Sequence, residues 1–429
     1  MKNSIAILAA GLGTRMKSPN AKVLQKLCGK SMILHILQKA FALSDDVSVI
    51  LAHQKEQISA EILKHFPQTQ ILEQDLERFP GTAGALRGLE PRYERALILC
   101  GDMPLVGQKS LENLLSSEAE LGLAVFEARD AKSYGRVVLC GGSVERIVEF
   151  KDASSDERAI TICNAGVYAL NSGLLRELLP LIENNNNAGE YYLTDIVKLA
   201  RARDAKIQAI FVDEDEFMGI NDKLELSRAE NLLQEKIRSH WMREGVILRN
   251  PSSIFIGADV EFVGECEVQE NVRIEGASRI IRSLIKSSSV IEESIVEDSD
   301  VGPLAHLRPH CVLKNAYIGN FVECKNAKLT GAKAGHLSYL GDCEVGEGSN
   351  IGCGTITCNY DGVKKHKTLI GKRVFVGSDT QFIAPVKVED EVIIAAGSTV
   401  SEDVPSGALF INRAPASMVQ NFYYKKFKK

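Results

Sequence analysis

The sequence predicts an α/β domain with a mostly parallel sheet, joined by a long helix to a parallel β-helix of hexapeptide repeats. Three observations predict this arrangement. Apolar runs alternate with helical patterns over residues 1–221, one helical period fills 222–245, and an apolar period of six runs through 246–429. The length of 429 residues also suits two hydrophobic cores better than one.

Composition excludes several classes of protein. A content of 45% hydrophobic and 25% charged residues is that of a soluble globular protein. The net charge of -5 gives no reason to expect binding to nucleic acid or to a membrane surface. No apolar stretch approaches the roughly 20 residues that span a bilayer, and the N-terminus shows no signal-peptide pattern. We therefore expect a cytoplasmic protein.

The ten cysteines allow a zinc or disulfide interpretation. None form a C-x-x-C pair, and the closest two, Cys353 and Cys358, have no histidine pair at ligand spacing. We expect them to be small buried side chains in a reducing compartment.

In the first half, short apolar runs mark the expected strands. The runs are Ile5–Ala9, Val47–Ala52, Ala96–Cys100, Leu121–Glu127 and Ile207–Val212. Helical spacing occupies Met32–Leu43 and Lys109–Leu115, and the polar run Asn184–Asn187 is expected in an exposed loop. Strands that alternate with helices predict a mostly parallel sheet covered by helices.

The segment 222–245 has purely helical spacing. One stripe carries Leu226, Ala229, Leu233, Ile237 and Trp241. Gly245 is the expected C-terminal stop, so this helix connects the two domains.

From residue 246 onward, aliphatic residues recur every six positions. The series are Ile256, Phe262, Val268, Ile274 and Ile280; Ile295, Val301, Leu307 and Leu313; and Ile370, Val376, Phe382, Val388, Ile394 and Val400. This period fits a β-helix whose coils each place aliphatic residues in a stacked core. The alternative is a β-sandwich with chance spacing, which three series in phase make improbable.

Interruptions of the repeat predict local features. Nearby glycines are expected at turns that need a positive φ: Gly257, Gly302, Gly371 and Gly377. The breaks at 281–294 and 358–369 are expected to be loops that leave the coil. The lysine-rich end, Phe422–Lys429, is expected to be a solvated tail.

A glycine turn with two cations follows the first predicted strand. Gly11 and Gly13 allow backbone N–H groups to approach a phosphate, while Arg15 and Lys22 add positive charge. Met16 stands at the third glycine position of the dinucleotide-binding fingerprint, so this turn departs from that motif. The pattern favours a phosphate site of another kind.

Asp102 follows the apolar run 96–100, where strand ends form the ligand crevice of α/β sheets. A carboxylate there suits Mg²⁺ held against substrate phosphates. A helix N-cap is the competing interpretation of Asp102.

Several motifs in this half resemble those of sugar-1-phosphate nucleotidylyltransferases. They are Leu8–Met16, Lys22–Leu24, Pro80–Thr82, Cys100–Pro104, Tyr134–Arg136, Ile147–Glu149, Asn164–Gly166 and Gly219–Asn221, in the order found in that family. They are most similar to the bifunctional uridylyltransferase/acetyltransferases of the GlmU family, which implies a Rossmann-like nucleotidylyltransferase domain. The implied donor is UTP and the implied acceptor is N-acetylglucosamine-1-phosphate.

The resemblance also implies residue roles. Asp102 and Asn221 hold Mg²⁺, and the other implied substrate contacts are Leu8, Ala9, Ala10, Gly11, Arg15, Lys22, Gln74, Gly81, Thr82, Gly135, Glu149 and Asn164. Ala21 departs from the proline usual before the lysine. The segment 73–80 is longer than usual, which leaves the contact of Gln74 with uracil open.

His336 is the candidate base of the second half. Cations in the same repeat region, with tyrosine and asparagine side chains, suit an anionic sugar phosphate beside a general base: Arg308, Lys325, Lys365, Tyr339, Asn350, Asn359 and Tyr360. A structural histidine among solvated faces is the alternative.

Further motifs match the acetyltransferase half of the same family. They are Leu307–Pro309, Gly319–Glu323, Gly335–Asp342, Gly354–Gly362 and Val376–Thr380. The resemblance implies a left-handed β-helix in which His336 is the base for acetylation of glucosamine-1-phosphate. Implied sugar-phosphate contacts are Arg308, Lys325, Tyr339, Asn350 and Lys365. Implied acetyl-CoA contacts are Cys353 (commonly alanine in the family), Asn359, Tyr360, Ser378, Ala396 and Arg413.

The resemblance therefore implies a homotrimeric enzyme that makes UDP-N-acetylglucosamine for peptidoglycan and lipopolysaccharide, with acetyl transfer preceding uridylyl transfer. Two alternatives remain. One is a plain nucleotidylyltransferase whose β-helix only regulates or oligomerises, and the other is a non-catalytic assembly protein. His336 with its cations argues against the first, and Arg15, Lys22 and Asp102 argue against the second.

Overall fold

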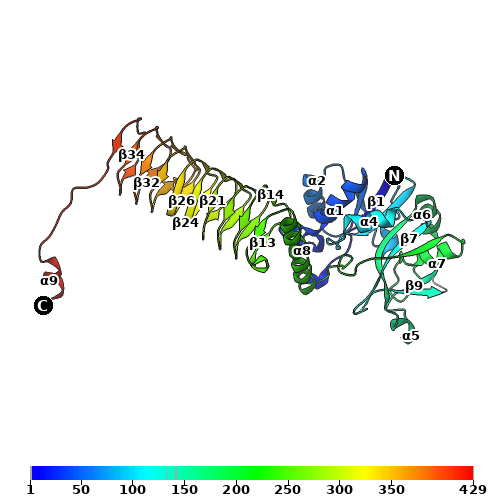
Figure 1. Cartoon of the computed structure of the whole chain (residues 1–429). Coiled ribbons are helices and arrows are strands. Elements are labelled where there is room, and N and C mark those ends of the chain that lie inside the picture. The colour runs from blue at the N-terminus through cyan, green and yellow to red at the C-terminus, as the bar shows by residue number, and fades with distance from the viewer. Residues whose placement is uncertain (1, 132, 141–142, 429) are drawn as a thin grey trace. The chain divides into compact units, whose positions relative to one another are not determined.

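The computed structural model describes residues 2–131, 133–140 and 143–428. The chain forms two compact units, Met1–Leu233 and Gln234–Lys429, each with its own core (Figure 1). The division falls inside the helix α8 (Lys223–Arg243). In the described part of the chain, every helix is too short or too polar to cross a membrane.

The first unit is built on a mixed sheet with the strand order β11-β7-β10-β6-β1-β4-β5, to which β8 and β9 add a hairpin beside β10. The strands are β1 (Asn3–Leu8), β4 (Asp46–Leu51), β5 (Gln70–Glu73), β6 (Arg95–Cys100), β7 (Leu121–Glu127), β8 (Arg136–Cys140), β9 (Ser143–Val148), β10 (Ile162–Asn171) and β11 (Ile207–Phe211). Along the main order only β10 runs against its neighbours. The prediction of a mostly parallel sheet is confirmed, and the opposing strand β10 is the feature that the apolar runs did not reveal.

Helices cover both faces of this sheet. They are α1 (Met32–Leu43), α2 (Lys55–His65), α3 (Thr82–Ala85), α4 (Gln108–Leu115), α5 (Ser155–Arg158), α6 (Ser172–Leu178) and α7 (Asp195–Arg201), with 3-10 turns η1 (Thr14–Met16), η2 (Lys22–Leu24) and η3 (Leu179–Leu181) and the short strand pair β2 (Lys26–Leu27) and β3 (Lys30–Ser31). On β1, Ile5 packs in the cluster that contains α1, whereas its neighbour Ala6 packs in the cluster that contains α6 and α7. This alternation is the reason why the strands are apolar on both faces. The polar run 184–187 lies in a loop, as predicted.

The stripe of α8 packs along its length, with Ala229 buried and the other residues half-buried. Ala229 and Leu233 pack in a cluster with Met16 of the first unit. Within the second unit, Ile237 and Trp241 pack against the core of the β-helix. The helix ends before Gly245, whose φ of 94° is the left-handed conformation expected of a C-terminal stop.

The second unit is a parallel β-helix of three strand ladders, whose coils stack in sequence order (Figure 1). The first ladder is β12 (Ile247–Leu248), β15 (Glu267–Val268), β18 (Leu284–Ile285), β21 (Asp300–Val301), β24 (Tyr317–Lys325), β26 (Lys333–Gly341), β28 (Asn350–Ile351), β31 (Phe375–Val376), β34 (Ile393–Ile394) and β36 (Leu409–Phe410). The second is β13 (Phe255–Ile256), β16 (Arg273–Glu275), β19 (Val290–Glu292), β22 (His306–Leu307), the second halves of β24 and β26, β29 (Ile356–Cys358), β32 (Gln381–Ile383) and β35 (Thr399–Val400). The third is β14 (Glu261–Val263), β17 (Arg279–Ile281), β20 (Ile295–Glu297), β23 (Val312–Lys314), β25 (Lys328–Thr330), β27 (Cys343–Val345), β30 (Thr368–Ile370) and β33 (Val386–Val388). This is the left-handed β-helix architecture expected of a hexapeptide repeat.

The core of this coil confirms the six-residue period, with two corrections. Val296 is buried, whereas the predicted core residue Ile295 is 36% exposed. The segment 281–294 does not leave the coil, because it contains β18 and β19. Here the spacing of inward residues shortens from six to five, as from Ile291 to Val296, and the buried corner residue Ser294 donates to the Glu292 carbonyl at 2.7 Å. A small hydroxyl side chain permits the tighter corner because it satisfies a backbone carbonyl.

The role predicted for the glycines is wrong at most positions. Of the four, only Gly302 has a positive φ. At Gly371 and Gly377 a Cβ would lie 2.4 Å from the next coil, so these glycines are needed for close stacking of coils. Left-handed corners are instead often occupied by residues such as Asn271 and Asp298.

The other two predictions for this unit hold with changed bounds: the loop predicted at 358–369 is shorter, and of the predicted tail Phe422–Lys429 the last residue lies outside the described residues. Residues 359–367 leave the coil between β29 and β30, closed by an antiparallel bridge between Tyr360 and Lys365. After the last coil, 411–428 are exposed and include the short helix α9 (Phe422–Phe427). Near the start of the unit, the 3-10 turn η4 (Pro251–Ser253) precedes β13.

Candidate functional site

A cavity of about 280 Å³ lies in the first unit at the carboxyl ends of β1 and β6. It is lined by Leu8, Ala9, Ala10, Gly11, Lys22, Val23, Gln74, Leu76, Gly81, Thr82, Ala85, Cys100 and Asp102. Most of the residues predicted for the phosphate site are therefore brought together. Sequence reasoning missed Val23, Leu76, Ala85 and Cys100, whose small or apolar side chains carry no chemical signature.

The turn after β1 is held tightly against its neighbours. Ala9 donates its backbone N–H to the Ile50 carbonyl at 2.9 Å, and Gly101 donates to the Leu8 carbonyl at 2.8 Å. Gly13 is left-handed, and a Cβ there would lie 2.6 Å from the Cβ of Lys22. Glycine is required because it lets the turn close over the lysine.

Lys22 is held between two oxygen ligands. Its Nζ lies 2.5 Å from Asp102 Oδ2 and 3.0 Å from Asn221 Oδ1. Asp102 caps no helix, since α4 begins later, at Gln108, so the N-cap interpretation is wrong. The carboxylate and the amide oxygen thus converge on one positive charge.

The N-terminus of α8 fixes Asn221. The Glu225 backbone N–H donates to Asp222 Oδ1 at 2.8 Å, and the Asn221 N–H donates to Glu225 Oε2 at 2.7 Å. This reciprocal capping, together with a bond from Asn221 Nδ2 to the Gly219 carbonyl at 3.1 Å, orients the side-chain oxygen of Asn221.

Gln74 is buried at one side of the cavity. Its Nε2 donates to the carbonyls of Phe79 and Gly81, both at 2.9 Å. Because both partners are acceptors, the orientation of the amide is fixed. The amide oxygen takes no hydrogen bond from the described residues and remains an acceptor.

Gly135, Glu149 and Asn164 form a second group near the cavity. Asn164 donates its N–H to the Gly135 carbonyl at 2.9 Å, and a Cβ at Gly135 would lie 3.4 Å from Glu149 Oε1. Thr194, which the sequence analysis missed, donates to Glu149 Oε1 at 3.3 Å. Burial raises the pKa of Glu149. Thr82 joins this group to the cavity, because its hydroxyl accepts the Leu193 N–H at 2.9 Å.

The states of Cys100 and Arg15 limit the chemistry expected at this cavity. Burial raises the pKa of Cys100 to about 12, so its thiol is protonated at neutral pH and is no nucleophile. Arg15 is exposed on η1 and does not line the cavity, so the structure does not bring this predicted residue to the site.

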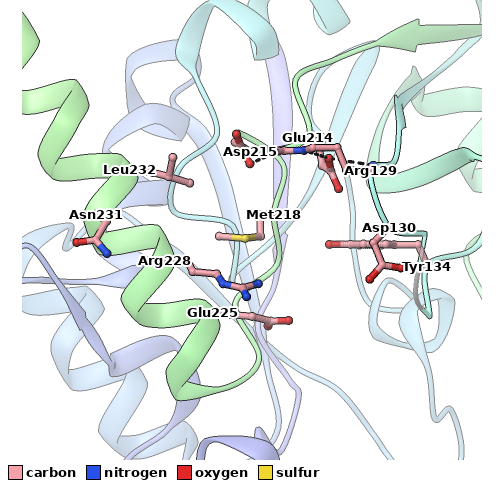
Figure 2. Close-up of a pocket in the computed structure, with 10 residues that line it drawn as sticks. All are labelled: Arg129, Asp130, Tyr134, Glu214, Asp215, Met218, Glu225, Arg228, Asn231 and Leu232. Carbon is pink, nitrogen blue, oxygen red and sulfur yellow. Dashed lines mark hydrogen bonds and ion pairs between the residues drawn. The ribbon is translucent and has the colours of Figure 1, made fainter.

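A second, larger cavity of about 670 Å³ occupies the same unit (Figure 2). It is lined by Arg129, Asp130, Tyr134, Glu214, Asp215, Met218, Glu225, Arg228, Asn231 and Leu232. Arg129 pairs with Glu214 at 2.6 Å and also with Asp215. None of the predicted site residues lies here, although Glu225 joins this cavity to Asn221.

On the β-helix, cations gather beside the second ladder. Arg308 Nη1 donates to Glu323 Oε1 at 3.1 Å. Lys365, within hydrogen-bonding reach, lowers the pKa of Lys325, and Arg308 adds to that effect. Tyr339 lies opposite Glu323 in register on the next coil. This arrangement concentrates positive charge, and a bound anion would reduce the repulsion between these cations.

The protruding loop 359–367 supplies part of this group. Asn359 Nδ2 donates to Asp342 Oδ2 at 2.5 Å and approaches the Tyr339 hydroxyl at 3.5 Å. Asp361 closes the loop through the Lys364 N–H at 2.6 Å, a backbone bond that lowers the pKa of this carboxyl. Tyr360, in the bridge at the base of the loop, is 60% exposed.

His336 lies at a different place, the corner between the first and second ladders. It is exposed and lies opposite Asn320 in register. Below it, corner residues of successive coils are joined by backbone hydrogen bonds, from Gly354 to Leu337, from Asp379 to Cys353 and from Gly397 to Ser378. Cys353, Ser378 and Ala396 therefore follow His336 along one edge, and Arg413 lies near Gly397.

The described contacts of one chain leave the predicted acetyl-transfer residues in two groups. The cations lie beside the second ladder and the corner residues follow His336, while Asn350 lies on the first ladder. No hydrogen bond or ion pair between described residues joins His336 to Arg308, Lys325 or Lys365.

Comparison with known proteins shows which family this chain resembles. Residues 5–169 match the MobA-like NTP transferase domain. The chain is 75% identical to bifunctional protein GlmU of Campylobacter jejuni serotype O:6 over 429 residues, all of both chains, and 66% identical to that of Campylobacter lari over the same span. It is 55% identical to that of Campylobacter concisus over 426 residues, 99% of this chain and 98% of the relative.

The chain belongs to the GlmU family. It is accordingly a bifunctional enzyme of UDP-N-acetylglucosamine synthesis for the cell wall, which transfers acetyl to glucosamine-1-phosphate and uridylyl to the N-acetylated product. Two alternatives are thereby excluded. One was a nucleotidylyltransferase whose β-helix only regulates or oligomerises, and the other was a non-catalytic assembly protein.

The departures from the GlmU pattern have structural explanations. Ala21 has a φ of -50°, a value that proline also adopts, so the turn could hold proline at this position without a change of backbone. The longer segment before Gly81 folds back on α3, where a Cβ at Gly84 would lie 2.0 Å from the Phe79 carbonyl. Cys353 is exposed at the corner edge.

Proposed function

We propose that the two activities occupy separate parts of the chain. Residues 1–221 carry uridylyl transfer, 222–245 form the helical linker, and 246–429 carry acetyl transfer. The observation that supports this division best is the convergence of Asp102 and Asn221 on Lys22, which lines a cavity of the first unit.

In the first unit we assign UTP to the cavity beside the glycine turn. Backbone groups of Leu8, Ala9, Ala10 and Gly11 face the nucleotide, with Gln74, Gly81 and Thr82 on the base side. Gly135, Glu149 and Asn164 contact the sugar phosphate. Arg15, exposed on η1, would add its charge to the leaving phosphates only if it turned toward them.

The donor set fits Mg²⁺. Asp102 Oδ2 and Asn221 Oδ1 already share one cation, the Lys22 ammonium, and both are oxygen ligands of the kind that Mg²⁺ prefers. Among the described residues there is no cluster of three metal-ligating side chains, which suits an ion completed by substrate phosphates. When bound, Mg²⁺ neutralises phosphate charge.

Uridylyl transfer then requires positioning and not a protein nucleophile. The acceptor phosphate oxygen attacks the α-phosphorus of UTP, and pyrophosphate leaves. Lys22 supplies positive charge to the phosphates when it leaves Asp102. The protonated Cys100 thiol takes no part.

On the β-helix, His336 is proposed as the general base that takes a proton from the amine of glucosamine-1-phosphate as it attacks the thioester of acetyl-CoA. Arg308, Lys325 and Lys365 hold the sugar phosphate, with Tyr339 and Asn350 on the sugar. Acetyl-CoA follows the corner edge and the loop, at Cys353, Asn359, Tyr360, Ser378, Ala396 and Arg413. Cys353 contributes backbone and no thiol chemistry.

We propose a homotrimer, because the first ladder ends in an uncovered apolar face. Phe375, Ile393 and Leu409 lie side by side on consecutive coils and are 54%, 50% and 60% exposed. A second copy would cover this face, and three-fold closure leaves no open edge. Neighbouring subunits would also supply residues such as Arg413 to the acetyl-transfer site. Sedimentation that showed a fully active monomer would contradict this assembly.

Cytoplasmic localisation is proposed from the ten cysteines, since no disulfide joins any two of them in the described part of the chain. The function is tested by supplying purified protein with glucosamine-1-phosphate, acetyl-CoA and UTP, with and without Mg²⁺. UDP-N-acetylglucosamine should form only when all are present. Removal of Mg²⁺ should stop uridylyl transfer alone.

A further inference from the structure

Behind the cavity of the first unit, an arginine lies between two aromatic rings. The Arg87 guanidinium is 5.0 Å from the ring centre of Phe79 and 5.4 Å from that of Tyr191. The two rings themselves meet edge to face at 5.8 Å. Arg87 has one weak hydrogen bond, from Nη2 to the Ile182 carbonyl at 3.4 Å, and its buried Nε has no partner. The rings are therefore the main contacts of this guanidinium.

The two rings belong to segments that lead to different parts of the site. Phe79 ends the turn that begins after Gln74, and Tyr191 precedes Thr194. The segments are bonded to each other, because Tyr191 N–H donates to the Pro80 carbonyl at 2.8 Å and Ala83 N–H donates to the Tyr191 carbonyl at 2.9 Å. Arg87 thus fastens the one segment to the other.

The Phe79 end of this contact reaches Gln74. The Phe79 carbonyl accepts one amide hydrogen of Gln74 and the Gly81 carbonyl accepts the other. With both hydrogens used, Gln74 offers the cavity only its amide oxygen. Such an acceptor pairs with the N3–H of uracil, whereas cytosine presents an N3 lone pair at the same position and is repelled.

The Tyr191 end reaches the sugar side. Leu193 N–H donates to the Thr82 hydroxyl at 2.9 Å, and Thr194 donates to Glu149 at 3.3 Å. A displacement of Tyr191 therefore moves groups near the acceptor as well as the base.

We propose that Arg87 is a positioning residue of uridylyl transfer: held between Phe79 and Tyr191, it keeps Gln74 as an acceptor-only reader of the base and couples that reading to the sugar-phosphate side. This rests on the proposed assignment of Gln74 to the base side of the cavity. Arg87 acts through Phe79 and Tyr191, since it does not line the cavity itself.

The test is Arg87→Met in the full-length protein, which keeps the length of the side chain and removes its charge and planar group. The expected result is a KM for UTP raised about tenfold, as the loss of two cation–ring contacts gives. The ratio of kcat/KM for UTP over CTP should fall by a similar factor, and acetyl transfer should not change. Arg87→Lys should recover part of the affinity for UTP that Arg87→Met loses. Phe79→Tyr should retain the preference for UTP over CTP, whereas Phe79→Leu should lose it.

Arg92→Met is the matched control, because Arg92 stacks on Tyr93 at 5.0 Å elsewhere in the same unit. Arg92→Met should leave the KM for UTP and the preference for UTP over CTP at their wild-type values. If Arg87→Met retains the wild-type KM for UTP and the wild-type preference over CTP, the positioning role is wrong. If wild-type protein itself fails to use UTP, the proposed function is wrong instead. Circular dichroism at the assay temperature shows whether the variant is folded; if Arg87→Met unfolds, Phe79→Leu against Phe79→Tyr decides the same question.

Discussion

The cavity of the first unit and the edge of the β-helix show two ways of building a site. In the cavity, Lys22, Asp102 and Gln74 are each held by hydrogen bonds within a hollow of about 280 Å³. On the β-helix, His336 is exposed and separate from the cations beside Lys365. The difference teaches that most residues of the first site meet within one chain, whereas those of the second stay in separate groups, which is the arrangement that the proposed trimer would join.

The largest expected effect is at the cavity. Asp102→Ala should reduce uridylyl transfer by more than about a thousandfold, because it removes the carboxylate proposed to hold the metal and frees Lys22. Acetyl transfer should remain within about twofold of wild type, since Asp102 belongs to the other unit. Both half-reactions are assayed on one preparation with Mg²⁺ present. Survival of uridylyl transfer within a few-fold would make the metal assignment wrong.

His336→Ala should have the opposite pattern with a somewhat smaller effect. Loss of a general base lowers acetyl transfer by at least about a hundredfold at neutral pH, with partial recovery at higher pH where more amine is neutral. His306→Ala is the control, because His306 lies two coils earlier in the same β-helix and pairs with Glu292. A folded His336→Ala variant with intact acetyl transfer would exclude this histidine as the base.

A smaller effect is expected where charge is shared. Lys365→Met should raise the KM for glucosamine-1-phosphate roughly tenfold with little change in kcat, since a charge-assisted contact to phosphate is lost. It should also raise the pKa of Lys325, because Lys365 is the main cause of its lowering. Lys367→Met is the control, as Lys367 pairs with Glu344. An unchanged KM would remove Lys365 from the sugar-phosphate site.

The smallest effect concerns stability and Glu149. A carboxyl whose pKa is raised on folding binds its proton more tightly in the folded state, so stability falls as pH rises through the carboxyl range. Because Glu149→Gln has no carboxyl to titrate, it should melt about 2 °C higher than the wild type at pH 8. Near pH 4 the two proteins should melt at the same temperature. Its KM for N-acetylglucosamine-1-phosphate should rise. Parallel melting curves of the two proteins at all pH values would contradict the burial argument.

Periodicity predicted the architecture well because it follows from which residues are buried. The six-residue series located the coils, and the apolar runs located five strands of the first sheet. It failed at Ile295, since the step from Val296 to Val301 is five residues around the buried corner residue Ser299, which places the inward position at Val296. A serine at the corner position carries no apolar signal, so the shift is visible only in the structure.

The sites were predicted unevenly for a similar reason. Charged or amide residues such as Lys22 and Asp102 stand out by their chemistry and their place at strand ends. Thr194 and Arg87 do not, because their partners are distant in the chain: Thr194 meets Glu149, 45 residues earlier, and Arg87 meets Tyr191, about a hundred residues later. The positive φ predicted for Gly371 failed because stacking of coils, and not the turn, demands a glycine there.

Mixing the variants Asp102→Ala and His336→Ala tests the central claim, that two independent sites act in sequence through a free intermediate. Each variant alone, given glucosamine-1-phosphate, acetyl-CoA and UTP, should form almost no UDP-N-acetylglucosamine. The mixture should form it, because Asp102→Ala releases N-acetylglucosamine-1-phosphate that His336→Ala then uridylylates. A mixture as inactive as its components, with each variant folded, would contradict the account.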